Sequence, residues 1–181
     1  LVTRVGLREK QERGLAEARG GRRGPENVWG SASTGACLSL LIGAGVEPRS
    51  LLLVGFSASF AAKLADTFGS EIGKRWGRRP VLITTLRSVP PGTEGAISLA
   101  GTLASAAGSV LMTLVMWQLQ LLPSISVSLV VMLIGLLATL AESLLGALAQ
   151  DRFRWLSNEL VNALQTLLAA VMAMLWLGGR I

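Results

Sequence analysis

Long apolar stretches separated by short charged segments constrain this chain more than any other feature. Each stretch has about the length that crosses roughly 30 Å of hydrocarbon at about 1.5 Å per residue. They cover approximately residues 28–46, 51–73, 94–118, 126–149 and 158–178. We therefore predict an all-α, polytopic transmembrane helix bundle with about five spans over residues 28–181, preceded by a basic segment at 1–27.

The composition agrees with a membrane environment and excludes several classes of catalyst. Apolar residues make up 51% of the 181 residues and charged residues 15%, and the mean hydropathy is +0.55. The sequence has no histidine and one cysteine, so a Ser-His-Asp triad, an intrachain disulfide and a histidine-ligated metal are excluded within it. The cysteine, Cys37, sits among small residues in a predicted span, and we interpret it as a buried apolar side chain.

The beginning of the chain is basic and is not a secretory signal. The first residue is Leu1 and not methionine, so we expect a piece of a longer protein or a processed product, with further spans upstream. Residues 1–27 contain no apolar run of the length that a signal peptide needs. They can form an interfacial helix up to Arg19, with Glu9 and Arg13 paired one turn apart.

The distribution of basic residues predicts the orientation. Seven lie in 1–27, five in 74–93 and two in 150–157, whereas the alternate connections carry one or none. Lysine and arginine are retained on the cytoplasmic side during insertion, so we place these three segments there. The net charge of +6 is explained by these loops, and we expect no nucleic-acid partner. Prolines in the 74–93 loop indicate that this connection has an ordered structure and is not a flexible linker.

The second predicted span carries charged residues on one helical stripe. Lys63, Asp66, Ser70 and Lys74 follow at intervals of three, four and four, and Glu71 lies beside them. Charges in a span are costly, so these groups should face a protein interior or a wet cavity. One interpretation is a Lys63–Asp66 ion pair that only fixes packing. The other is a site where carboxylates hold Mg²⁺ and lysines meet phosphate oxygens.

A glycine-rich loop precedes the third stretch. Gly92 and Gly95 permit close approach of a phosphate, and the start of a helix attracts anions. The loop is not a Walker motif. An equally good interpretation is that Thr93 caps the helix.

Other polar residues fall near the same membrane boundary. Glu142 and Ser143 lie two turns before the basic 150–157 loop, and an intramembrane glutamate is a functional candidate. Asn158 and Asn162 open the last stretch, where interhelical hydrogen bonding is the alternative role. Arg22, Arg23 and Asn27 precede the first stretch and can clamp phosphate or only enforce orientation. With Glu94, these groups suit phosphoryl transfer, which depends on positioning and on Mg²⁺ and requires no imidazole.

Several segments together resemble a family of integral membrane proteins related to transmembrane protein 19, which includes the plastid phytyl-phosphate kinase of vitamin E (tocopherol) synthesis. The most specific segments are Ala65-Asp-Thr-Phe-Gly-Ser-Glu-Ile-Gly and Val89-Pro-Pro-Gly-Thr-Glu-Gly-Ala-Ile-Ser. Gly21-Arg-Arg-Gly-Pro-Glu-Asn-Val, Glu142-Ser-Leu-Leu-Gly and Asn158 with Val161-Asn162 also match. The family is distantly similar to membrane cytidylyltransferases and to dolichol and phytol kinases.

The resemblance implies roles for individual residues. Asp66 and Glu71 would be the metal or nucleotide ligands, and Gly92, Thr93 and Gly95 the phosphate loop. Supporting roles would fall to Asn27, Ser70, Glu142, Ser143, Asn158 and Asn162. The family pattern has aspartate at position 142, so Glu142 is a departure that reaches one methylene further.

These observations give one leading hypothesis and two rivals. The leading one is a CTP- or other NTP-dependent kinase, a transferase that converts a prenyl (phytyl-like) monophosphate to its diphosphate with Mg²⁺. Asp66, Glu71, Lys63 and Glu142 would form its catalytic group, and Lys74 and the arginines would neutralise phosphate. The rivals are a cytidylyltransferase that makes a CDP-lipid and a non-enzymatic transporter or assembly factor. A prokaryotic inner membrane or a plastid membrane fits the resemblance, and a homo-oligomer is compatible with it.

Overall fold

The structure is a computed structural model, which describes residues 2–4, 6–16, 24–150, 152–153 and 155–180. A short N-terminal part contains η1 (Val2–Arg4) and α1 (Leu7–Glu12). The long helices are α3 (Pro25–Gly43), α4 (Arg49–Trp76), α5 (Leu99–Gln118), α6 (Ile125–Leu145) and α7 (Asn158–Gly178). A π-helical turn, η2 (Gly146–Gln150), continues α6, and β1 (Val81–Leu82) pairs in antiparallel register with β2 (Ala96–Ile97).

Within the described residues, four helices are long and apolar enough to cross a membrane. They are α4, α5, α6 extended by η2, and α7. The predicted polytopic helical bundle is therefore confirmed, but the number of spans is four and not five. The helix that falls short is α3, because serine, threonine and glycine in its middle lower its hydropathy. Its Cys37, which we expected to be buried, is exposed.

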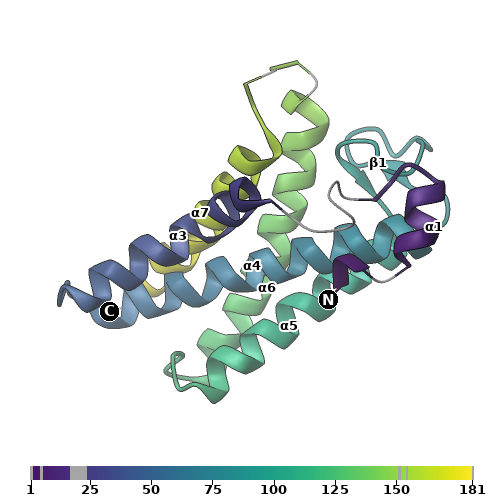
Figure 1. Ribbon diagram of the computed structural model, residues 1–181. Helices are drawn as coiled ribbons and strands as arrows, with labels where there is room; N and C mark the ends of the chain where they lie inside the picture. Colours follow the sequence, from purple (N-terminus) through teal and green to yellow (C-terminus); the bar gives the residue numbers. More distant parts are fainter. Residues whose placement is uncertain (1, 5, 17–23, 151, 154, 181) are drawn as a thin grey trace.

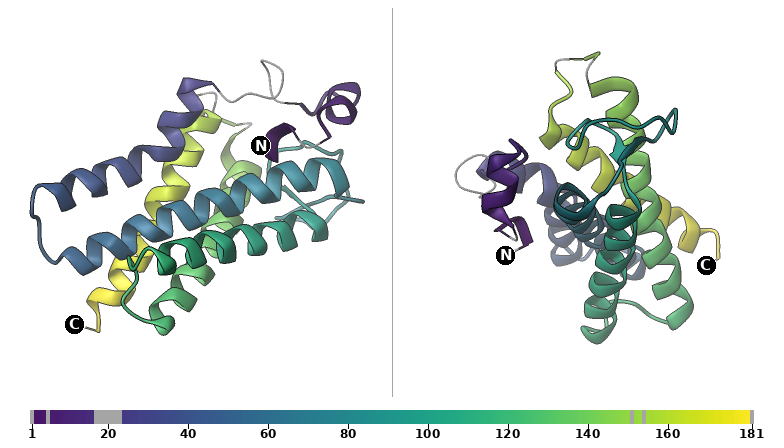
Figure 2. Two further views of the ribbon diagram at one scale, coloured as in Figure 1. Left: turned by 60° about the horizontal axis from the view of Figure 1, so that its bottom comes forward. Right: turned by 90° about the vertical axis from the view of Figure 1, so that its right-hand side faces the viewer.

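Helix α4 lies at the centre of the bundle. The other four long helices all pack against it. Figure 2 (left) shows α3, α4 and α5 side by side, with α6 and α7 crossing behind them. Ala58, Ala61, Ala62 and Ala65 of α4 are completely buried. These small side chains let neighbouring helices approach closely, which drives association where lipid offers no hydrophobic gain.

Contacts between α4 and α5 are especially close. A Cβ atom added at Gly108 of α5 would lie 2.7 Å from the carbonyl oxygen of Leu64. On the same face, one added at Gly101 would lie 3.1 Å from the carbonyl oxygen of Gly69. Gly101 and Gly108 therefore lie in a close interface between α4 and α5, where a larger residue would collide with the α4 backbone.

Serine caps set the starts of three helices. The hydroxyl oxygens of Ser98, Ser124 and Ser157 accept hydrogen bonds from backbone N–H groups in the first turns of α5, α6 and α7, at 3.1, 3.3 and 3.4 Å. Helix α5 thus begins at Leu99, five residues after the start expected at 94. The prediction that the glycine-rich loop opens a helix, and that Thr93 caps it, is wrong. That loop leads into β2.

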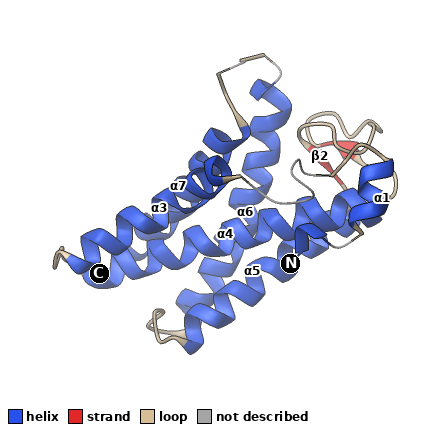
Figure 3. Cartoon of the chain, in the orientation of Figure 1, coloured by secondary structure: helices blue, strands red, loops and turns tan. Residues whose placement is uncertain are grey.

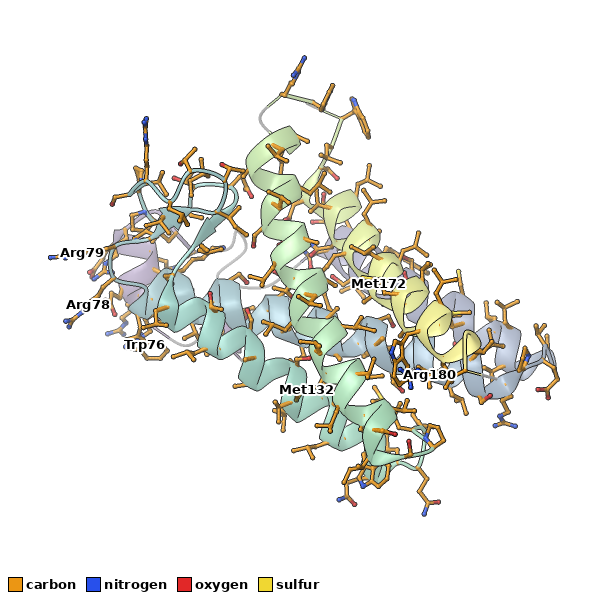
Figure 4. The ribbon with its side chains drawn as sticks, turned by 180° about the vertical axis from the view of Figure 1, so that it is seen from behind. Trp76, Arg78, Arg79, Met132, Met172 and Arg180 are labelled. Atoms are coloured by element: carbon orange, nitrogen blue, oxygen red, sulfur yellow. The ribbon has the colours of Figure 1, made fainter. Side chains whose placement is uncertain are left out.

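The five long helices alternate in direction (Figure 1). The starts of α3, α5 and α7 and the ends of α4 and α6 consequently lie toward one side of the bundle. Figure 3 shows the strand pair and α1 at this same side. Figure 4 shows Arg78 and Arg79 at this end and Arg180 at the opposite one. We call this side the basic face, and its location in the cytoplasm stays a prediction.

Candidate functional site

A polar cavity of about 360 Å³ opens at the basic face. Its volume falls within the range of about 300–1,000 Å³ typical of ligand sites. The walls come from four helices, from η2 and from the loop that contains β2. Residues of the cavity wall include Asp66, Ser70 and Lys74 of α4, Gly92, Thr93, Glu94 and Gly95 of the loop, Ser98, Thr102 and Ser105 at α5, Thr139, Leu140, Glu142 and Ser143 of α6, and Asn158 and Asn162 of α7.

Most of the residues that the sequence singled out meet in this cavity. The stripe predicted on α4 faces it through Asp66, Ser70 and Lys74, as a helical period requires. Glu142 and Ser143 reach it from α6, and the two asparagines reach it from the first turns of α7. Residues separated by up to about a hundred positions in the sequence are thus brought together by the alternating helix directions.

Lys63 lies one turn deeper on α4 and connects the cavity wall to α7. Its Nζ atom is 2.7 Å from Oδ2 of Asp66 and 2.6 Å from Oδ1 of Asn162. The side chains of Lys63 and Asp66 are each 13% exposed. The ion pair considered from the sequence is therefore present. It holds an oxygen of Asp66 in a defined position while Asp66 still lines the cavity.

Carboxylates outnumber cations in the cavity wall. Asp66, Glu94 and Glu142 line it together with a single lysine, Lys74, among the described residues. Asp66 and Glu94 are close enough to repel a charge on Glu142, and Lys63 is close enough to attract it. A phosphate would meet these carboxyl groups, and like charges repel. A divalent cation between carboxylates and phosphate would remove this repulsion.

Glu71 does not reach the cavity, although it adjoins Ser70 in the sequence. Its side chain is buried and forms an ion pair with Lys10 of α1. The Lys10 Nζ atom also donates to the carbonyl oxygen of Thr3, at 3.0 Å. Because successive helical residues are rotated by about 100°, Glu71 points toward the N-terminal part and Ser70 toward the cavity. The structure therefore does not support Glu71 as a metal ligand.

The predicted phosphate clamp before α3 is only partly described. Arg22 and Arg23 lie outside the described residues. Asn27 is in the first turn of α3, is 7% exposed, and accepts a weak hydrogen bond from the Ser31 hydroxyl at 3.4 Å. It is absent from the cavity wall as far as the described residues define it.

The glycine-rich loop forms a tight turn whose conformation requires glycine. Gly92 and Gly95 have φ angles of +87° and +71°, which residues with a Cβ atom rarely adopt. The Thr93 hydroxyl donates to the carbonyl oxygen of Pro90 at 2.8 Å, which closes the turn. A Cβ atom at Gly95 would overlap the side chain of Ala147 and lie 2.6 Å from the carbonyl oxygen of Ser143. The loop is thus seated directly on the end of α6.

The residues present fit Mg²⁺ better than a metal that needs a complete protein cage. Within the described part of the chain, no three Asp, Glu, His or Cys side chains are close enough to hold a metal ion. Mg²⁺ characteristically uses one or two carboxylates and completes its shell with water and substrate phosphates. Asp66 and Glu142, which both line the cavity, can supply such a pair.

Several polar residues of the site were missed in the sequence. Ser98, Thr102, Ser105 and Thr139 also line the cavity. Thr139 stands three residues before Glu142, on the same face of α6, and this spacing was the available signal. Gln165 supports Thr139 from α7, because its Nε2 atom donates to the Thr139 hydroxyl at 3.0 Å and to the carbonyl oxygen of Ala62 at 3.1 Å.

Comparison with known proteins agrees with this architecture. Residues 1–170 match the family described as integral membrane protein DUF92. The chain is 47% identical over 173 residues to the uncharacterized membrane protein sll0875 of Synechocystis, covering 95% of this chain and 67% of the relative. It is 41% identical over 180 residues to the chloroplastic protein VTE6 of Arabidopsis thaliana, covering 96% of this chain and 54% of that protein.

A more distant relative is the uncharacterized membrane protein MJ0933 of Methanocaldococcus jannaschii, 35% identical over 97% of this chain and 70% of its own length. The chain thus spans between about half and about two thirds of these relatives. No solved structure matches the chain. The family resemblance drawn from the Ala65 and Val89 segments is confirmed, and the protein is embedded in the lipid bilayer. The chain belongs to the integral membrane protein family DUF92.

Proposed function

We propose that this protein is a membrane-embedded kinase that transfers the terminal phosphoryl group of CTP, or of another nucleoside triphosphate, to a prenyl monophosphate. The observation that carries the proposal is the cavity at the basic face, where Asp66, Glu142 and Lys74 meet a glycine turn at the end of membrane-spanning helices. The family resemblance supplies the acceptor class, a phytyl-like lipid phosphate.

The charges of the cavity wall support phosphoryl transfer. Asp66 and Glu142 would hold Mg²⁺, which when bound would supply positive charge to neutralise the nucleotide phosphates during transfer. Lys74 lines the same cavity and can meet a phosphate oxygen as a point charge. Lys63 supports this arrangement from below, because it fixes Asp66 against Asn162.

The reaction needs little else from the protein. An oxygen of the acceptor phosphate forms a new bond to the terminal phosphorus of the nucleotide. The bond from that phosphorus to the bridging oxygen breaks, and the nucleoside diphosphate leaves. The acceptor is already anionic at neutral pH, so no general base is required, which agrees with a chain that lacks histidine. Positioning and electrostatics supply most of the rate in such reactions.

The glycine turn contributes backbone groups at the mouth of the cavity. Gly92 and Gly95 line the cavity and carry no side chains of their own, so a phosphate can meet backbone groups of the turn. This role does not depend on a helix start, since α5 begins only at Leu99. The hydroxyls of Ser70 and Ser143 lie in the same wall and are further donors for phosphate oxygens.

Double labelling tests the proposal against its nearest rival. The purified full-length protein is incubated with Mg²⁺, a twenty-carbon prenyl monophosphate and CTP labelled at either the α or the γ phosphorus. A kinase places γ label in a lipid diphosphate, whereas a cytidylyltransferase places α label in a CDP-lipid. Absence of both labels from the lipid, with CTP, ATP, GTP and UTP each supplied, would reject an enzyme of this class.

A further inference from the structure

The cavity adjoins the lipid-facing surface between α5 and α6. Leu140 lines it, and one turn to either side on α6 stand Leu137 and Leu144, which are 43% and 41% exposed. On α5, Thr102 lines the cavity, and its neighbour Leu103 is 62% exposed. In a transmembrane bundle such exposed leucines face acyl chains. Polar and apolar surfaces therefore meet on both helices at one place.

The two helices touch on one side of this place and separate on the other. Their contact lies at Ser109, whose hydroxyl donates to the carbonyl oxygen of Met132 at 2.7 Å. A Cβ atom at Gly135 would also overlap Ser109. From that point toward the basic face the helices diverge, which the view from behind in Figure 4 shows. Both helices contribute residues to the cavity wall on this side, Thr102 and Ser105 from α5 and Leu140 and Ser143 from α6.

Other elements form two further walls of the cavity. At the basic face, the loop crosses from α5 to α6, with Gly95 seated on Ala147 and on the Ser143 carbonyl. Behind it, α4 forms the wall through Asp66 and Ser70. The border between the cavity wall and the lipid-facing leucines is therefore framed by α5, α6 and the loop. We call it the α5–α6 window, bordered by Thr102 and Leu103 on α5 and by Leu140 and Leu144 on α6.

We infer that the α5–α6 window is the passage through which the hydrocarbon tail of the lipid phosphate leaves the cavity into the bilayer. This inference rests on the proposed function, since it requires the lipid's phosphate to bind in the cavity. Placing a prenyl tail among the carboxylates and hydroxyls of the cavity is unfavourable, because the tail loses its apolar surroundings. The window lets the phosphate reach Asp66 and Lys74 while the tail stays among leucines.

If the tail passes through the window, bulky substitutions there should lower kcat/KM for long substrates selectively. Leu140→Trp and Leu103→Trp place a bulky ring at its border. Their kcat/KM for a twenty-carbon prenyl monophosphate should fall about tenfold relative to a five-carbon one, which has little tail to accommodate. Matched controls are Leu133→Trp on α6 and Leu114→Trp on α5, which are 51% and 53% exposed in the unsubstituted protein and stand away from the cavity. These should keep the wild-type ratio.

Each result decides the matter. A changed ratio in both window variants and in neither control supports the inference. An unchanged ratio, an equal loss with both substrates, or the same change in the controls overturns it. Failure of the wild-type protein to phosphorylate either substrate would instead reject the proposed function.

A binding measurement that needs no catalytic turnover tests the window separately from the proposed function. A prenyl monophosphate with a photoreactive diazirine in its first isoprene unit is bound and illuminated, and the labelled peptides are mapped. The corresponding prenyl alcohol, which lacks the phosphate, serves as the control. Labelling around residues 102–103 and 140–144 that depends on the phosphate supports the window. Labelling spread equally over the leucines of all spans overturns it.

Discussion

Lys10 of α1 and Glu71 of α4 form a buried ion pair between the N-terminal part and the centre of the bundle. Their side chains are each 2% exposed. A neighbouring contact joins Glu9 to Arg75, with an oxygen of Glu9 3.6 Å from a guanidinium nitrogen of Arg75. Further along the chain, Leu15 lies against the glycine turn, since a Cβ atom at Gly92 would be 2.7 Å from Cδ2 of Leu15. The N-terminal part is thus fastened beside the cavity and touches its loop.

Glu71→Gln should lower stability without changing the dependence on Mg²⁺. Removing one partner of a buried pair leaves an uncompensated charge on Lys10 and costs about 3–5 kcal/mol. Replacing both partners with apolar residues, as in Lys10→Met with Glu71→Leu, should recover most of that loss. Thermal unfolding in detergent measures the stability of each variant. A Mg²⁺ titration of nucleotide-induced stabilisation measures the dependence on Mg²⁺. A weaker Mg²⁺ response in Glu71→Gln would restore Glu71 as a metal ligand.

Asp66→Asn should abolish most phosphoryl transfer while the protein still inserts and folds. Loss of a carboxylate that binds Mg²⁺ removes several kcal/mol of transition-state stabilisation, or roughly a hundredfold in rate or more. The asparagine can still accept a hydrogen bond from Lys63, so the helix packing should survive. Turnover is compared with that of Glu47→Gln, which changes an exposed acid at the opposite end of α4. Near-normal turnover in Asp66→Asn would reject the metal assignment.

The sequence predicted those site residues whose positions depend on local periodicity. Asp66, Ser70 and Lys74 share a helical stripe, and the helix does place all three in the cavity wall. The partner of Glu71 could not be predicted, because Lys10 is 61 residues away and lies in a segment whose docking no local pattern encodes. The start of α5 was misplaced for a different reason. The glycine turn looks like a helix start, but Ser98 supplies the actual cap.

The number of spans also shows that local sequence patterns do not reveal features that depend on distant partners. Long apolar runs identify α4, α5, α6 and α7, because each must satisfy its backbone hydrogen bonds internally in lipid. Helix α3 has a polar seam, in which Thr34 and Thr166 of α7 are hydrogen-bonded at 3.0 Å. A sequence shows the polar residues of such a seam, but their partners appear only when the helices are packed together.

Gly95→Ala should damage the junction between the loop and α6. The substitution forces an alanine into a left-handed conformation and drives its Cβ atom into Ala147. We expect a loss of about 2–4 kcal/mol, the sum of backbone strain and overpacking. Gly45→Ala separates these contributions, because Gly45 also has a positive φ angle, +76°, but has open space around it. It should cost only about 1–2 kcal/mol. Equal losses of thermal stability in the two variants would contradict the close seating of Gly95 on α6.

The orientation of the bundle can be tested with single cysteines. Arg78 is exposed on the basic face, and Gln118 is exposed at the end of α5 on the opposite side. In a Cys37→Ser background, Gln118→Cys should react with a membrane-impermeant maleimide in intact cells. Arg78→Cys should react only after the membrane is permeabilised, because the basic segments are retained in the cytoplasm. The reverse pattern would place the cavity on the outer side, away from cytoplasmic nucleotides, and would contradict both the orientation and the proposed kinase.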